Sequence, residues 1–471
     1  MKKSSELIAN SGIVFGTSGA RGLVTDFTPD ICAAFALSFA HVMSKKNKFN
    51  TLAIAIDNRP SSYKMAQAIS ASLKQLNIKA LYYGIVPTPA LAFYAMQKSM
   101  PCIMVTGSHI PFDRNGLKFY RPDGEITKTD ESLIIKAQVE VSPLKALPEL
   151  ITLSDAKLAY IERNLASFEP QALKGKRIGI YEHSSAGRDI YRDIFSALGA
   201  DVISLGRSDE FVPIDTEAVS NEDINRAKVW VDEYKLDALF STDGDGDRPL
   251  LSDENGQWLR GDILGLLCSK LLGIEALATP VSCNTAIEQS DLFKSVVRTK
   301  IGSPYVISEF NNLDKKYKSV AGFEANGGYL LASKLEIKGK SIQPLPTRDA
   351  VLPVIVVLSQ LQKSTVSQLV NTLPKRFTAS DRIRGFAREK SLELIANITK
   401  SPSVWLPKLL LNKKLTATDD TDGFRMTFDD GSIVHLRPSG NAPELRCYAE
   451  CDSQNQADKL ALTTLKQIQK L

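Results

Sequence analysis

Short apolar runs alternate with helically spaced apolar residues along the first third of the chain. Residues 51–57 and 102–106 are typical of buried strands, and residues 81–86 form a third such run. Between them, residues 63–76 carry apolar side chains at helical spacing, and a short helix is expected near Leu91. Strands that alternate with helices predict a parallel sheet with helical crossovers.

The same alternation recurs twice further along the chain. The second round contains predicted strands at 177–181, 201–206 and 237–243, and predicted helices at 190–198 and 221–234. The third runs from a helix at 262–272, through residues 279–284, to the run at 319–328. All three rounds end on a polar loop that contains glycine and follows an apolar strand. This recurrence predicts three related α/β domains.

The last hundred residues have a different pattern. Residues 424–428 and 432–438 flank an Asp-Asp-Gly turn, which indicates a hairpin, and residues 444–450 form a further strand. An amphipathic helix is expected over 456–471. The predicted fold class is α/β, with three related mixed α/β domains and a C-terminal α+β domain. The predicted domains are 1–150, 151–255, 256–370 and 371–471.

Composition narrows the class of protein. The chain is 43% hydrophobic and its net charge is only +5, which favours packed domains and no nucleic-acid or membrane partner. Six cysteines without a C-x-x-C spacing predict buried free thiols of a reducing compartment. The N-terminus has no apolar run typical of a signal peptide, and the apolar stretch 351–358 is too short for a membrane span. We expect a cytoplasmic protein, monomeric or homodimeric.

The most specific local motif is Asp-Gly-Asp-Gly-Asp-Arg. Its carboxylates, Asp243, Asp245 and Asp247, alternate with glycines, so three oxygen ligands can converge. Hard cations such as Mg2+ prefer oxygen ligands. An acidic surface turn is one alternative. A calcium loop, with Glu254 at its twelfth position, is another, but a strand precedes this motif where a calcium loop needs a helix.

A second loop begins where a predicted strand ends, at Thr106. Ser108 is a possible nucleophile there, and His109 and Lys118 are possible proton carriers or phosphate contacts. A serine in such a loop can equally well cap a helix. This segment alone therefore leaves the role of Ser108 open.

A third loop, near the C-terminus, has the composition of a phosphate cradle. It offers two guanidinium groups, a hydroxyl, an amide and a turn that glycine permits, from Arg437, Ser439, Gly440, Asn441 and Arg446. A solvent-facing turn between strands would look similar.

Two further loops contain groups that can bind a ligand. In the segment 322–328, Glu324 and Asn326 can pair with sugar hydroxyls, although a simple turn explains the segment as well. The N-terminal segment 15–22 can form a phosphate nest around Arg21, or merely a tight turn.

Taken together and in this order, the five segments resemble the α-D-phosphohexomutase superfamily, over essentially the whole chain. The resemblance implies four domains around a central cleft, with one functional loop from each. It implies that Ser108 is phosphorylated, and that Asp243, Asp245 and Asp247 hold Mg2+ together with that phosphoserine. It also assigns roles to the other residues: His109 and Lys118 in proton transfer and phosphate binding, Arg21 and Arg248 as active-site arginines, Glu324 and Asn326 in sugar recognition, and Arg437, Ser439, Gly440, Asn441 and Arg446 at the distal phosphate.

The sequence departs from the common family pattern at a few positions. Ile110 replaces an asparagine in the serine loop. In the sugar loop Asn326 replaces a serine, and Gly328 stands where a histidine is common. Asn441 and Ala442 stand where the phosphate loop commonly has threonine and glutamate. These departures affect sugar specificity more than the chemical core.

The resemblance implies a phosphotransferase that interconverts hexose 6-phosphate and hexose 1-phosphate. The cofactors would be Mg2+ and a hexose 1,6-bisphosphate that is both intermediate and activator, and the partner would be a small sugar phosphate. We expect a phosphomannomutase, with phosphoglucomutase or dual activity as the alternative and phosphoglucosamine mutase behind both. A metal-dependent phosphatase is disfavoured because it needs no second phosphate site. A non-catalytic sugar-phosphate-binding protein is the alternative from another class.

Overall fold

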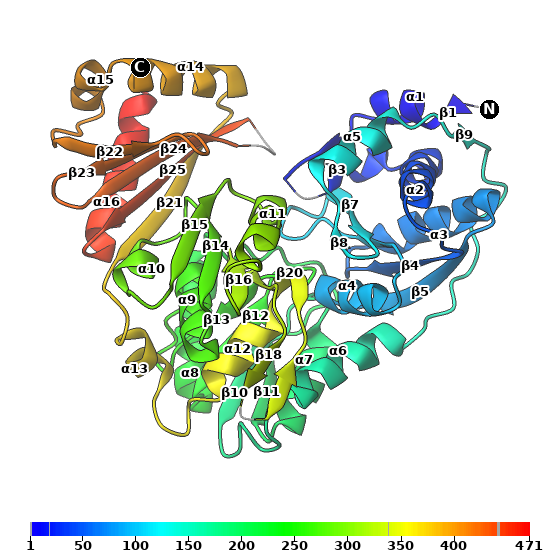
Figure 1. The fold of residues 1–471 in the computed structure, drawn as a ribbon, viewed down its shortest axis with the longest axis horizontal. Helices are drawn as coiled ribbons and strands as arrows, with labels where there is room; N and C mark the ends of the chain where they lie inside the picture. Colours follow the sequence, from blue (N-terminus) through cyan, green and yellow to red (C-terminus); the bar gives the residue numbers. More distant parts are fainter. Residues whose placement is uncertain (1, 18, 338, 440–442) are drawn as a thin grey trace.

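Four main β-sheets follow one another along the chain, each flanked by helices (Figure 1). The computed structural model describes residues 2–17, 19–337, 339–439 and 443–471. Two additional sheets have two strands each and join β1 (Lys2–Lys3) to β9 (Glu140–Val141) and β18 (Leu335–Ile337) to β19 (Lys340–Ile342).

The first sheet has seven strands and a mixed topology. β4 (Thr51–Ile56) lies parallel to β5 (Lys79–Ile85) and to β6 (Cys102–Val105), as predicted, whereas β7 (Arg114–Arg121) runs antiparallel to β6. Antiparallel strands continue the sheet beyond β7: β3 (Ala20–Leu23), β2 (Val14–Phe15) and β8 (Gly124–Glu125). The helices of this unit are α1 (Ser4–Ala9), α2 (Pro29–Ser44), α3 (Ser62–Leu73), α4 (Thr88–Gln97) and α5 (Lys128–Lys136).

The second sheet repeats the central part of the first. β10 (Arg177–Tyr181) lies parallel to β11 (Asp201–Leu205) and to β12 (Ala238–Thr242), and β13 (Pro249–Leu251) runs antiparallel to β12. The predicted helices are present nearby as α7 (Arg188–Ala197) and α8 (Asn221–Tyr234), and α6 (Asp155–Ala166) precedes the sheet.

The third sheet has the same plan again. β14 (Ala276–Pro280) is parallel to β15 (Ser295–Thr299) and β16 (Val320–Phe323), and β17 (Tyr329–Leu331) is antiparallel to β16. One more antiparallel strand, β20 (Leu345–Asp349), pairs with β17. The helices are α9 (Gly261–Leu272), α10 (Ala286–Gln289), α11 (Ser303–Leu313), α12 (Val351–Leu358) and α13 (Val366–Val370).

This shared topology confirms the prediction of three related α/β domains. In each sheet one strand lies between two parallel neighbours, and the later neighbour turns back through a loop into an antiparallel strand. The serine, aspartate and sugar loops of the sequence occupy that same connection, β6–β7, β12–β13 and β16–β17. The fold therefore places all three candidate loops at equivalent edges of related sheets.

The fourth sheet is entirely antiparallel, as expected for an α+β domain. Its strand order is β21 (Phe377–Arg384), β25 (Glu444–Cys451), β24 (Ile433–Pro438), β23 (Phe424–Phe428) and β22 (Leu415–Asp419). The predicted hairpin is confirmed, with Gly431 at a φ of +76° between β23 and β24. The helices α14 (Arg388–Lys400), α15 (Pro402–Lys408) and α16 (Gln454–Ile468) share one apolar core with this sheet, whose opposite face bears cavity-lining residues such as Arg437 and Arg446 (Figure 1).

Buried apolar residues form separate cores that match these sheets. The fourth sheet and its helices enclose a core of their own, whereas one continuous core joins the second and third sheets and reaches α4. The linking helix α6 is tied to the third sheet by Asp349, which accepts hydrogen bonds from Tyr160 at 2.5 Å and Arg163 at 2.8 Å. The first three units are thus joined more extensively than the fourth.

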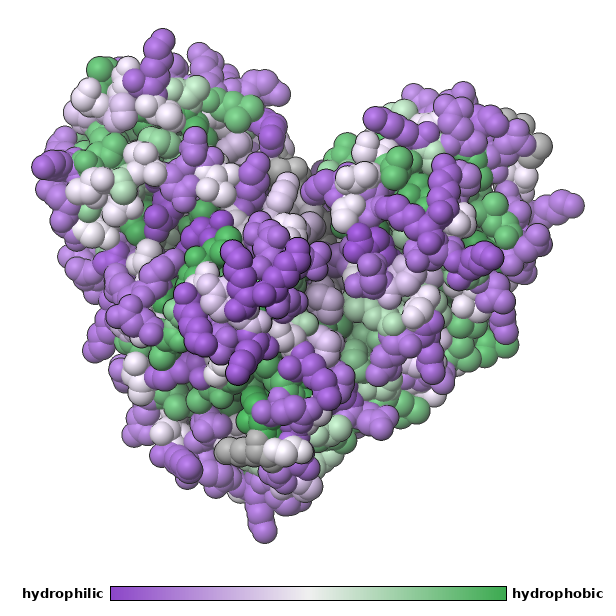
Figure 2. All heavy atoms as spheres, in the orientation of Figure 1, coloured by the Kyte–Doolittle hydropathy of each residue, from purple (hydrophilic) through white to green (hydrophobic). Residues whose placement is uncertain are grey.

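The overall shape follows from this packing. The N-terminal and C-terminal units form two lobes separated by a notch, and the second and third units lie below it (Figures 1 and 2). All six cysteines are buried free thiols, as predicted. Among the described residues no helix combines the length and the apolar character needed to cross a membrane.

Candidate active site

The serine and aspartate loops meet directly. Ser108 is fully buried between β6 and β7, and its Oγ donates a hydrogen bond of 2.6 Å to Asp243 Oδ2 in the loop between β12 and β13. Ser108 has a φ of +55°, a left-handed conformation that non-glycine residues rarely adopt. Backbone strain of this kind persists only where the surroundings enforce it. The two predicted chemical loops are therefore parts of one site.

His109 lies between the serine and a cluster of arginines. Its Nδ1 is 3.4 Å from Ser108 Oγ and 2.8 Å from Arg248 Nη1. An arginine can only donate, so Nδ1 accepts and carries no proton. Burial lowers the pKa of His109 well below its usual value, and the charges of Arg248 and Arg21 lower it further. The imidazole is consequently neutral, and its Nδ1 is unprotonated.

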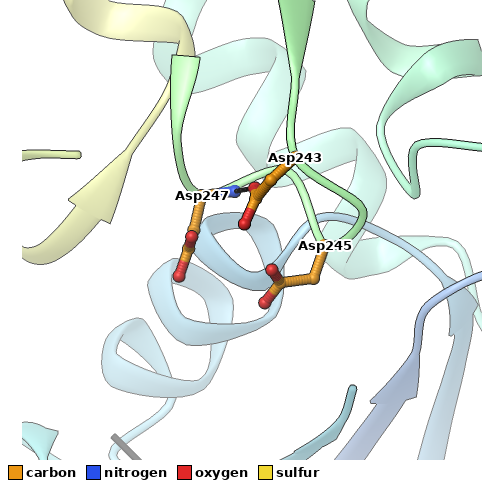
Figure 3. A group of neighbouring side chains, drawn as sticks. All are labelled: Asp243, Asp245 and Asp247. Carbon is orange, nitrogen blue, oxygen red and sulfur yellow. Dashed lines mark hydrogen bonds between the residues drawn. The ribbon is translucent and has the colours of Figure 1, made fainter. Parts of the chain in front are cut away.

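The three aspartates form a compact cluster of carboxylates. Asp243, Asp245 and Asp247 are buried, and ligand oxygens from all three lie within 4.8 Å of one another. Figure 3 shows these carboxylates on the same side of their loop. One oxygen of Asp245 and one of Asp247 are buried without a hydrogen-bond partner among the described residues. A hard divalent cation fits such a donor set, because it is bound by carboxylate oxygens that have no hydrogen-bond donor.

Lys118 supplies positive charge to this cluster. Its ammonium group lies 2.5 Å from Asp245 Oδ2 and 2.6 Å from Asp247 Oδ2. Burial acts to lower the pKa of Lys118, but the two carboxylates outweigh it and the pKa is raised. Burial and the charges of Asp245 and Asp247 raise the pKa of Asp243 well above its usual value. The calcium-loop alternative fails here, because a strand precedes the loop and Ser367 donates to the Glu254 carboxylate.

Most of the other predicted residues line one cavity of about 130 Å³ at the centre of the molecule. Residues from all four sheet units contribute to its wall, as the prediction of a central cleft requires. The predicted residues that line it are Arg21, His109, Arg248, Glu324, Asn326, Arg437, Ser439 and Arg446. Ser108, Lys118 and the three aspartates are buried and are not part of the cavity lining. Gly440 and Asn441 lie outside the described residues.

The sugar loop is held in a defined conformation. Asn326 Oδ1 accepts a hydrogen bond of 3.0 Å from the Gly328 amide, and its carbonyl accepts one of 2.8 Å from Thr216. The Glu324 carboxylate accepts a hydrogen bond from Arg348 Nε. Both predicted sugar-binding side chains are thus fixed by neighbours while they face the cavity.

Among the described residues that line the cavity, six arginines outnumber four carboxylates. Burial and the charge of Arg248 lower the pKa of Arg21 to about 10, so its guanidinium is still charged at neutral pH. Arg437 is oriented by Asp422, with 2.8 Å between Nε and Oδ2, and Asp422 also accepts from the Ile301 amide. That shared carboxylate links the fourth unit to the third beside the cavity. The arrangement suits a ligand with more than one anionic group.

The sequence analysis missed Arg382, which lines the cavity from β21, and two further arginines of the site. Arg348 reaches the cavity from β20, and Arg59 supports the serine loop from behind. Neither lies in a recognised motif. Arg59 follows Asp57 at the end of a predicted strand, and a charged pair at the end of a buried strand is the only signal that could have singled it out.

Arg59 is buried, and it uses its whole guanidinium group. It donates to the carbonyls of Ser108 and Ile110, and to those of Pro111 and Arg114, while its Nε donates to Asp57 at 3.2 Å. Its guanidinium carbon also lies 3.9 Å from the ring centroid of Phe211 in the second unit. These contacts fix the loop that holds Ser108 in its left-handed conformation.

Comparisons with known proteins agree with this geometry. Models of phosphoglucomutase/phosphomannomutase domains match the chain: alpha/beta/alpha domain I at residues 12–143, alpha/beta/alpha domain III at 260–377 and the C-terminal domain at 388–467. A phosphomannomutase of Salmonella muenchen is 56% identical over 98% of this chain and 97% of its own length. The chain belongs to the phosphoglucomutase/phosphomannomutase family. It is accordingly an enzyme of the phosphohexomutase class.

More distant relatives show the same fold. A phosphomannomutase of Sinorhizobium fredii is 40% identical over 95% of this chain and 97% of its own. A phosphoglucomutase/phosphomannomutase family protein from Burkholderia thailandensis has a TM-score of 0.75 at 17% identity, covering 100% of this chain and 98% of its own. An N-acetylphosphoglucosamine mutase of Aspergillus fumigatus, solved with GlcNAc-6P and magnesium, has a TM-score of 0.60 at 13% identity, covering 99% of each chain.

The contacts of Arg59 predict a positioning role in this phosphohexomutase. Arg59→Lys keeps the charge but cannot reach four carbonyls, so Ser108 should lose its fixed position. We expect kcat to fall by roughly 10- to 100-fold, because small misplacements of a reacting group are costly. KM should change by less than about threefold, since Arg59 does not line the cavity.

Steady-state kinetics with a hexose 1-phosphate would measure both parameters. Arg121→Lys, an equally conservative change at a more exposed arginine of the same unit, is the control. An Arg59→Lys enzyme with wild-type kcat would contradict the positioning role.

Proposed function

We propose that the protein is a phosphomannomutase that interconverts mannose 6-phosphate and mannose 1-phosphate through a phosphoserine at Ser108 and a hexose 1,6-bisphosphate intermediate. The observation that carries the proposal is the 2.6 Å contact between Ser108 Oγ and Asp243, beneath a cavity lined by arginines. The sugar comes from the name of the relative in Salmonella muenchen, which is 56% identical.

The proposed step exchanges one phosphate ester for another. The bond between phosphorus and Ser108 Oγ breaks, and a bond to the free hydroxyl oxygen of the hexose phosphate forms. The proton of that hydroxyl passes to the protein and returns to Ser108 Oγ, with His109 and Lys118 as its proposed carriers. The reverse step at the other end of the bisphosphate restores the phosphoserine and releases the isomer.

We propose that Asp243, Asp245 and Asp247 hold one Mg2+ together with the phosphoserine. A phosphoserine would carry about −1.5 to −2 charge at neutral pH, and a divalent cation held by the aspartates would offset that charge and the charge that develops during transfer. The Aspergillus fumigatus relative was solved with magnesium and GlcNAc-6P. In this chain, Arg21 and Arg248 line the cavity near His109 and are proposed to contact the transferred phosphoryl group.

The remaining residues are proposed to hold the rest of the substrate. Glu324 and Asn326 would bind the sugar hydroxyls. The distal phosphate would be bound by Arg437, Ser439, Gly440, Asn441 and Arg446. We retain the domain division 1–150, 151–255, 256–370 and 371–471, with one of these loops in each. Because the fourth unit has its own core, it is the part best suited to open while the bisphosphate turns around.

Phosphoglucomutase or dual activity is the second candidate, because a tenfold preference between the sugar epimers needs only ~1.4 kcal/mol. A non-catalytic binding protein is disfavoured, since Ser108 and all three aspartates are present and in contact. The deciding assay compares turnover of mannose 1-phosphate with that of glucose 1-phosphate, with Mg2+ and bisphosphate added. We expect activity on both and a preference for mannose. Turnover of glucose alone would make the protein a phosphoglucomutase.

Ser108→Ala removes the proposed phosphate carrier. We expect activity to fall by at least a thousandfold, and the phosphate to be missing from the intact-protein mass. The variant should still fold, with a lower thermal unfolding midpoint because Asp243 loses the hydrogen bond from Ser108. Ser44→Ala, at an exposed serine, controls for loss of a hydroxyl. Turnover near the wild-type rate in Ser108→Ala would rule out the phosphoserine.

Asp245→Asn keeps the shape of a metal ligand and removes its charge. We expect the Mg2+ concentration for half-maximal activity to rise at least tenfold, and the maximal rate to fall. A chelator should abolish wild-type activity, and added Mg2+ should restore it. Asp232→Asn, at an exposed aspartate, is the matched control. An unchanged Mg2+ dependence in Asp245→Asn would refute the ligand assignment.

A further inference from the structure

The side chains of the two residues that flank Arg348 in β20 make contacts outside the cavity. Thr347 donates a 2.7 Å hydrogen bond to Glu125 of the first unit, and Asp349 accepts from Tyr160 and Arg163. Successive side chains of a strand point to opposite faces. The Arg348 side chain therefore points to the opposite face of β20 from Thr347 and Asp349, into the cavity. Those two neighbours hold the strand in place.

The Arg348 guanidinium lies between the sugar loop and the aspartate loop. Its Nε donates to Glu324, and its Nη1 is 3.8 Å from Asp247 Oδ2. Although the residue is only 3% exposed, it lines the central cavity. Among the described residues, neither of its terminal nitrogens has a hydrogen-bond partner. A buried guanidinium with unused donors beside a cavity is a binding group for an oxygen-rich ligand.

Gly328 provides the space that this arginine occupies. A Cβ at position 328 would lie 2.6 Å from Cδ of Arg348, 2.7 Å from its Cγ and 3.0 Å from its Cβ. The φ of Gly328 is not positive, so the backbone would accept a side chain there. The three heavy atoms nearest to such a Cβ all belong to Arg348. The resemblance to the superfamily leads one to expect a histidine at position 328. This chain has no side chain there, and the stem of Arg348 occupies the space instead.

We propose that Arg348 binds the substrate directly, taking the position of the side chain that Gly328 lacks. Its terminal nitrogens donate to oxygens of the hexose phosphate at the junction between the sugar loop and the reacting end. The inference rests on the proposed function and adds a residue to it. A planar group with two outward donors can pair with vicinal hydroxyls or with phosphate oxygens. It can therefore serve both orientations of a bisphosphate that must turn around.

A purely structural role is the competing explanation, in which Arg348 only balances the charge of Glu324. Arg348→Lys separates the two roles, because lysine retains the charge but lacks the planar fork. If Arg348 contacts the substrate, kcat/KM should fall about tenfold or more in the lysine variant. If it only balances charge, kcat/KM should stay within about twofold of wild type.

A double-mutant cycle tests the coupling to position 328. Gly328→Ala alone should lower kcat/KM at least tenfold, because the added methyl group displaces Arg348. Arg348→Ala alone should lower it by about thirtyfold. In the Arg348→Ala background, adding Gly328→Ala should cost less than about twofold, since the clash is gone. Lys334→Ala, at an exposed lysine of the same unit, controls for loss of positive charge.

The outcomes distinguish this inference from the proposed function. If the wild-type protein turns over neither hexose phosphate, the proposed function fails and the inference falls with it. If the wild type is active but Gly328→Ala matches it, or the two single effects multiply in the double variant, only the inference is overturned. Thermal unfolding of each variant shows whether it folds. Should Arg348→Ala not fold, the Arg348→Lys and Gly328→Ala enzymes still decide the question.

Discussion

The site depends on the compensation of buried charge. Three carboxylates within 4.8 Å of one another would repel strongly in a protein interior. Lys118 offsets two of them through contacts of 2.5 and 2.6 Å. Hydroxyl groups add local support, because Ser108 donates to Asp243 and Thr88 donates to Asp245 at 2.5 Å. These three donors come from the first unit, so its docking compensates much of the charge buried in the second unit. Arg248 of the second unit and Arg348 of the third add positive charge at 3.6 and 3.8 Å from Asp247.

The repeated topology explains how loops far apart in sequence supply these charges. In each α/β unit, the chain leaves a parallel strand and turns back as an antiparallel one, and the loop between them projects from the same edge of its sheet. Ligands of α/β proteins generally bind beyond the carboxyl ends of parallel strands. Packing three such units around one cavity brings Ser108, the three aspartates and Glu324 together although each loop is short.

The sequence located the loops that line the candidate site better than the residues that support them. Strand 51–57 and the loop at Ser108 could be located because apolar runs end abruptly in polar residues there. Arg59 and Arg348 could not be found in this way, because their partners lie far away along the chain, 49 positions for Ser108 O and 24 for Glu324. The antiparallel strands β2 and β3 were also missed. They are short, and β3, to which β2 pairs, is held by β7 about a hundred residues away, which leaves no local pattern.

Arg348 and Gly328 illustrate why a loop motif cannot be interpreted in isolation. In the sequence, Gly328 stands where the superfamily commonly has a polar side chain, so the sugar loop lacks that group. In space, the same position is filled by an arginine that approaches from the next strand of the sheet, with 2.6 Å between its Cδ and a hypothetical Cβ. A larger residue at position 328 would displace Arg348, and a displaced Arg348 would lose its hydrogen bond to Glu324. Residues 328 and 348 are therefore coupled. In this chain, the surface that the sugar loop presents to the cavity therefore depends on a residue of the neighbouring strand as well as on its own residues.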